Sequence, residues 1–217
     1  MDKKFKAHID TAIKELDNPT FNLTKQYLEV MKVEKENGVP KVARIDDKQS
    51  DSNIIYFYIK NEKFFLVVNV SKKKPFEVEW VWIESGHRVY LTATSKKLTY
   101  KELSSNLSLS PLSGWSKGEI KQQNQLEYKF SRVSYEPNKN EAYGLEEKLV
   151  ELLITLEKDT EGVRSLSKIA DSYISICKNQ YISANKGIHL NMDIISRLNN
   201  LNLEIDIDTY ICGNELK

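Results

Sequence analysis

The 217-residue sequence has little of what marks several large classes of protein. Its only two cysteines are Cys177 and Cys212, and no CxxC pair occurs, so the sequence predicts neither a disulfide framework nor a cysteine metal site. Eight glycines and five prolines are too few for a fibrous or disordered chain. No apolar run approaches the roughly 20 residues of a membrane span. The first residues also lack the apolar segment of a secretory signal, so we expect a cytoplasmic protein outside the membrane.

The charges are numerous and balanced. Lysine and arginine total 32, aspartate and glutamate total 31, and the net charge is +1. This balance gives no electrostatic reason to expect nucleic acid or an anionic membrane as partner. The length suits one folded unit, with an N-terminal sub-region over residues 1–87 and a second over 88–217. Residues 95–97 are too few to act as a flexible linker between domains.

The N-terminal sub-region predicts a helix followed by strands. Apolar residues recur every three or four positions over residues 2–17, which is typical of an amphipathic helix, and Asn18-Pro19 ends it. Residues 23–36 favour a second helix, although valines in that segment leave a strand possible. Four runs rich in β-branched and aromatic residues then follow at 54–59, 63–70, 76–83 and 88–94. Their short connections predict a four-stranded antiparallel meander.

The second sub-region mixes both periodicities. Thr99 and Glu102 form a capping-box pattern at the start of a helix, and leucines from position 145 predict a longer one. Asn191 suits the N-cap of a third. Strands are expected at 126–135, 173–177, 186–190 and 203–211. The order from residue 88 is β-α-β-α-β-β-α-β, so we predict an α+β fold in which helices cover one face of a mostly antiparallel sheet.

Several segments carry a resemblance to a known family. They are Leu98–Leu103, Leu107–Pro111 and Gly114–Gly118; further on, the resemblance includes the leucine-rich helix that ends with Leu152–Glu157 and the terminal segment Leu201–Tyr210. Over residues 94–210 the chain resembles the bacterial DUF4279 family, a domain of unknown function, although Leu112 follows the proline where the family usually has threonine. The resemblance implies an α+β fold and bacterial origin; residues 1–87 match nothing, and the family lends no activity.

Aromatic residues supply the first candidate binding sites. Trp80 and Trp82 share the parity of one predicted strand, so their rings point to the same face, where they either fill the core or form an exposed patch. Trp115 and Lys117 lie in a glycine-flanked loop that can bring a lysine and backbone N–H groups toward a ligand. A structural role for Trp115, between helix and sheet, is the simpler interpretation.

Three acidic residues supply the second candidate. Glu204, Asp206 and Asp208 alternate along the last predicted strand and therefore share a face. They suit a hard cation, a basic partner surface or, most simply, contact with solvent. We predict no metal and no cofactor, because no ligand spacing or nucleotide-binding motif is present.

These observations favour a non-enzymatic protein that acts through protein–protein binding, for example an immunity- or defence-associated inhibitor. The first alternative is an enzyme with a dispersed site, for which His87, Glu84 and Lys117 are the candidate participants. The second is a single-stranded nucleic-acid binder that uses the aromatic and lysine-rich meander as a stacking platform. The sequence leaves the partner and the oligomeric state open.

Overall fold

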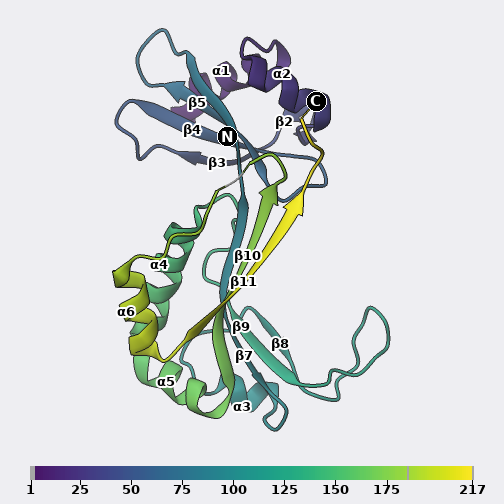
Figure 1. Cartoon of the computed structure of the whole chain (residues 1–217), viewed down its shortest axis with the longest axis vertical. Coiled ribbons are helices and arrows are strands. Elements are labelled where there is room, and N and C mark those ends of the chain that lie inside the picture. Colours follow the sequence, from purple (N-terminus) through teal and green to yellow (C-terminus); the bar gives the residue numbers. More distant parts are fainter. Residues whose placement is uncertain (1–2, 185, 217) are drawn as a thin grey trace.

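The computed structural model describes residues 3–184 and 186–216, and these form two large β-sheets with helices packed against each, together with one two-stranded sheet (Figure 1). The class predicted from the sequence, α+β with mainly antiparallel strands, is confirmed. Figure 1 places the four-stranded sheet with α1 and α2 above the five-stranded sheet with α4, α5 and α6.

The four-stranded sheet has the order β3-β4-β5-β6, with all neighbours antiparallel. The elements of this half are η1 (Lys3–Phe5), α1 (Lys6–Asp17), α2 (Asn22–Val30), β1 (Lys35–Glu36), β2 (Val39–Pro40), β3 (Val42–Asp46), β4 (Ser52–Tyr58), β5 (Phe65–Ser71) and β6 (Val78–Glu84). The short strands β1 and β2 form a separate hairpin. Ile9, Ala12 and Leu16 of α1 pack on the sheet, as the helical spacing predicts.

The five-stranded sheet has the order β11-β10-β7-β9-β8, and only the β10–β11 pair is parallel. Its elements are β7 (Gly86–Ser95), α3 (Tyr100–Ser104), β8 (Ser113–Trp115), β9 (Ser131–Tyr135), α4 (Leu145–Leu156), η2 (Glu157–Asp159), α5 (Thr160–Ile169), β10 (Asp171–Tyr181), α6 (Met192–Leu201) and β11 (Glu204–Cys212). Leucines of α4, among them Leu149, Leu152 and Leu153, are fully buried against β7 and β10. These residues form the core of this half.

Several predicted strands differ from those in the structure. The strand at 88–94 exists as part of β7, but it leaves the meander and pairs with β10 and β9. The fourth strand of the first sheet is instead β3, within a segment that the sequence did not mark. Residues 186–190 form no strand, and the strand predicted to begin at 126 begins at 131. The helix predicted over 23–36 ends at Val30.

Only Ser85 separates β6 from β7, and the chain passes at this residue directly from one sheet to the other. Gly86 is required there, since a Cβ atom on it would lie 1.8 Å from the carbonyl oxygen of Lys63. At the same junction the ammonium of Lys148, which is 1% exposed, donates to the carbonyl oxygens of His87 at 2.8 Å and Asn140 at 3.0 Å. A buried lysine therefore ties α4 to the first residues of β7.

Both sheets also meet at the far end of the β10–β11 pair. Tyr181 at the end of β10 belongs to the core of the N-terminal half, where its ring contacts Phe64 and Tyr27. Its hydroxyl donates to the carbonyl oxygen of Asn214 at 2.6 Å, and the Asn214 side chain donates to the carbonyl oxygen of Val30 at 3.2 Å. The strand pair of the second sheet thus reaches into the first half of the molecule.

Candidate functional site

One face of the five-stranded sheet is turned away from α4, α5 and α6, and we call it the open face. Residues of β7 and β10 that pack on the helices, such as Leu91 and Ile174, alternate with residues that point to this face. The pairing registers extend the same face to the other three strands. The open face carries Arg88, Tyr90, Thr92, Thr94, Ser113, Trp115, Arg132, Ser134, Asp171, Tyr173, Ser175, Cys177, Asn179, Glu204, Asp206, Asp208 and Tyr210.

Arg132 on β9 lies next to the edge strand β8, at one side of the open face. Its Nε donates to Ser134 Oγ at 3.2 Å, and its Nη2 donates to Thr92 Oγ1 at 3.2 Å. The guanidinium carbon lies 5.5 Å from the ring centre of Trp115 and 5.7 Å from that of Tyr90. Two hydroxyl groups and two aromatic rings therefore fix the position of this cation.

The middle of the open face is formed by small hydroxyl side chains between larger aromatic ones. The hydroxyl groups of Thr92 and Ser175 lie 3.0 Å apart across the β7–β10 pair. The Tyr90 hydroxyl lies 3.7 Å from the Cys177 sulfur. Burial raises the pKa of the Tyr90 phenol, and its contact with Cys177 adds to that effect. At physiological pH this phenol is therefore neutral.

The three candidate acids lie at the opposite side of the open face, on the edge strand β11. Glu204 pairs in register with Tyr173, Asp206 with Ser175 and Asp208 with Cys177. All three acids are exposed, and within the described part of the chain none forms an ion pair. Their negative charge is therefore available to a partner.

The structure places five of the seven candidate binding residues on or next to the five-stranded sheet. Trp115 shares the open face with the three acids but lies at its other edge, on β8. Its ring stacks on Tyr128 at a centroid distance of 4.4 Å, and its indole N–H donates to the carbonyl oxygen of Phe130 at 3.0 Å. Lys117 follows β8, and its ammonium donates to the carbonyl oxygen of Lys96 at 3.4 Å.

The other two candidates, Trp80 and Trp82, lie on the edge strand β6 of the other sheet. Trp80 is 68% exposed. Trp82 is half-buried beside Val67, and its indole N–H donates to Glu84 Oε2 at 3.3 Å. The two tryptophans therefore belong to a different surface from the open face.

The residues of the dispersed-enzyme hypothesis do not converge. His87 is buried at the start of β7, where its Nδ1 lies 3.2 Å from the carbonyl oxygen of Tyr143, and burial lowers the pKa of its imidazole to about 4. Glu84 is close enough to influence that pKa. Lys117, in contrast, contacts Lys96 beyond the other end of β7, and the length of the strand separates it from His87 by about 30 Å.

No pattern in the sequence singles out Arg132, Tyr90 or Tyr173 as candidates. Alternation within 88–94 and 131–135 contains a usable signal, because polar and apolar residues take turns in both segments. This alternation predicts which residues of one strand share a face, but it does not predict which strands are neighbours in the sheet. Arg132 reaches Trp115 and Thr92 only because β9 lies between β8 and β7.

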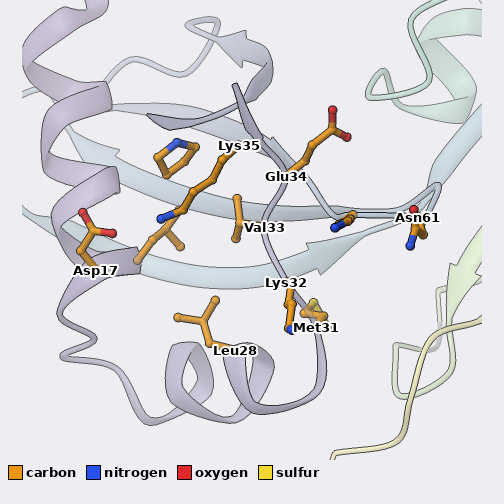
Figure 2. A pocket seen from close by; sticks show the side chains of 11 residues that line it. Asp17, Leu28, Met31, Lys32, Val33, Glu34, Lys35 and Asn61 are labelled. Carbon is orange, nitrogen blue, oxygen red and sulfur yellow. The ribbon is translucent and has the colours of Figure 1, made fainter. Parts of the chain in front are cut away.

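No grouping of three or more metal-binding side chains occurs in residues 3–184 and 186–216. Nor does a helix in this part of the chain have both the length and the apolar character to cross a membrane. A pocket of about 800 Å³ lies in the N-terminal half (Figure 2). Leu28, Met31 and Val33 contribute apolar surface to it, and Figure 2 shows Asp17 and Lys35 around the same space. None of the candidate residues lines this pocket.

Together these features define an α+β protein of two sheets in which one sheet face is left open by its helices. The chain belongs to the DUF4279 family, because the model of that domain of unknown function matches residues 85–212, more than half of the chain. No curated protein and no solved structure matches the chain. The matched region contains all residues of the open face, whereas the residues that line the N-terminal pocket precede it.

Proposed function

We propose that this chain is a bacterial cytoplasmic protein that acts by binding another protein on its open face. The observation that carries the proposal is a sheet face without a helical cover that holds a fixed arginine between two aromatic rings at one side. Arginine and aromatic side chains on rigid strands contribute strongly to interfaces, because little side-chain freedom is lost when a partner binds.

The connection between β8 and β9 supports a protein partner. It carries three exposed apolar side chains, Ile120 at 52%, Leu126 at 60% and Phe130 at 38%. Figure 1 shows this hairpin extending away from α4, α5 and α6. Exposed apolar side chains beside a polar surface are typical of protein–protein interfaces, in which an apolar centre is surrounded by polar residues.

The row formed by Glu204, Asp206 and Asp208 favours a partner with a basic surface. Complementary charges accelerate association and exclude partners of the same sign. A protein that covers a basic surface blocks whatever that surface binds. For this reason we propose an inhibitory role, of the kind found in immunity and defence systems.

Affinity purification from the native host tests the proposal. The wild-type chain is compared with an Asp206→Lys/Asp208→Lys double variant and with Glu161→Lys, a charge reversal on α5 that serves as the matched control. We expect one stoichiometric partner, recovered at roughly one tenth of the wild-type yield with the double variant and at the wild-type yield with the control. A partner recovered equally with all three proteins, or no stoichiometric partner, would contradict binding at the open face.

The inhibitory role is tested separately, by measuring the activity of the recovered partner with and without the chain. Inhibition that the double variant loses is expected. Unchanged partner activity would refute the inhibitory role and leave the binding proposal standing.

A further inference from the structure

The arginines differ in one respect that points to a ligand. The chain has five arginines, and in the described part of the structure four of them form an ion pair with a carboxylate. The pairs are Arg44 with Asp46 and Glu147, Arg88 with Glu136, Arg164 with Glu161, and Arg197 with Glu157 and Asp193. Arg132 is the exception, since no carboxylate of residues 3–184 or 186–216 lies within ion-pair distance of it.

Arg132 is nevertheless held in position by its neighbours in the sheet. Its two hydrogen bonds go to the neutral hydroxyl groups of Thr92 and Ser134, which position the guanidinium without neutralising it. Thr92 is itself fully buried, and Ser134 is 5% exposed, so both supports are fixed in the sheet. A guanidinium has five N–H donors, so these two bonds and the contact with the Tyr90 hydroxyl still leave N–H groups for a ligand.

We infer that Arg132, between Trp115 and Tyr90, is a binding site for a single carboxylate group of the partner protein. This inference names the chemistry of one part of the open face and rests on the function proposed above. The planar fork of N–H groups matches the two oxygen atoms of a carboxylate, and a charge-assisted pair of this kind is stronger than a neutral hydrogen bond. The two rings, 5.5 and 5.7 Å from the guanidinium carbon, restrict the directions from which the group can approach.

The rest of the open face favours a carboxylate over a phosphate. Glu204, Asp206 and Asp208 lie on the same face, and their charges oppose the approach of a multiply charged anion or a nucleic-acid backbone. A carboxylate brings one negative charge and meets less repulsion. The partner surface that complements the open face is therefore mainly basic where it meets β11 and carries one acidic side chain where it meets Arg132.

Nuclear magnetic resonance of the full chain with ¹⁵N-labelled arginine tests the site without the partner. Sodium acetate is the probe, sodium phosphate is the competing anion, and sodium chloride controls for ionic strength. We expect the Nε–H signal of Arg132, assigned by its loss in Arg132→Lys, to shift saturably with acetate. The signal of Arg164, which already faces Glu161, is expected to move only as it does in chloride.

A Ser134→Ala variant provides the matched test of preorganisation. It removes one hydroxyl that holds the guanidinium and is expected to weaken acetate binding roughly three- to tenfold while Arg132 remains in place. An Arg132 signal that responds no more than that of Arg164 would overturn the inference, and tighter binding of phosphate than of acetate would overturn the carboxylate assignment. Because no partner is present, failure here is distinguishable from failure of the purification experiment.

Discussion

The histidine at the start of β7 provides a quantitative test of how the two sheets are joined. His87 is 5% exposed, and burial lowers the pKa of its imidazole from 6.5 to about 4. The folded protein therefore holds this side chain neutral, whereas the unfolded chain takes up a proton as the pH falls through 6.5. The resulting stability is fully present above pH 6.5 and is lost as the pH falls toward 4.

The size of this effect follows from the difference between the two pKa values. The free energy of unfolding is expected to fall by about 2 kcal/mol between pH 7 and pH 5, and by about 3 kcal/mol between pH 7 and pH 4, through His87 alone. Urea unfolding followed by tryptophan fluorescence measures it at each pH. The comparison is with His87→Asn, which has no group that titrates in this range.

The variant and the wild type share all their other titratable groups, so the difference between their two curves isolates His87. We expect the variant to be less stable at pH 7, because the hydrogen-bond geometry at the Tyr143 carbonyl changes. Its stability should then approach that of the wild type as the pH falls. Two parallel curves would refute the assignment of a buried, neutral imidazole at the junction.

Three further changes test other parts of the structure by chemical denaturation. Lys148→Met leaves the carbonyl groups of buried His87 and partly buried Asn140 without this donor and is expected to cost about 2–4 kcal/mol of stability; no loss would show that the junction does not need this ammonium. Gly114→Ala places a Cβ atom 2.3 Å from the ring of Tyr100 and should lower the melting temperature, whereas Gly144→Ala, which meets no atom within 4 Å, is the control. Asn191→Ala removes the N-cap of α6, and about 1 kcal/mol should be lost; an unchanged midpoint would contradict the cap.

Local signals in the sequence predicted those elements that local interactions determine. The capping box of α3 is present, with Glu102 N–H donating to Thr99 Oγ1 and Thr99 N–H donating to Glu102 Oε2. Asn191 caps α6 as expected, because its side chain accepts from Ile194 N–H at 2.9 Å. The alternation at 203–211 predicted β11 to within one residue at each end. In each case the determining atoms lie within a few residues of one another.

The errors arise where distant contacts decide the structure. Short connections predicted a hairpin between β6 and β7, but β7 crosses to the second sheet, where its neighbours β9 and β10 come much later in the chain. The strand predicted at 186–190 is absent. In this segment the ammonium of Lys186 pairs with Glu84, and the backbone carbonyl oxygen of Lys186 accepts a hydrogen bond from Lys178 Nζ. A side chain of β10 thus takes up a backbone carbonyl that a strand would have used.

The candidate site also has one part that a single strand determines and one part that distant contacts determine. The acidic row on β11 is visible because one strand contains it. The site around Arg132 depends on β8, β9 and β7 lying side by side, and this order is not encoded in the pattern of any single segment. Trp115 could be selected only as an unusual residue, since its contact with Arg132 is a tertiary one.

Position-resolved photocrosslinking in the native host tests the central claim most directly. A photoreactive phenylalanine analogue is placed on the open face at Asp206 and at Thr94, and on the helical side at Ile154 of α4, which is 50% exposed. We predict that both open-face positions yield an adduct with the same protein and that the α4 position yields none. Adducts that form equally from both sides of the sheet, or only from α4, would contradict binding at the open face.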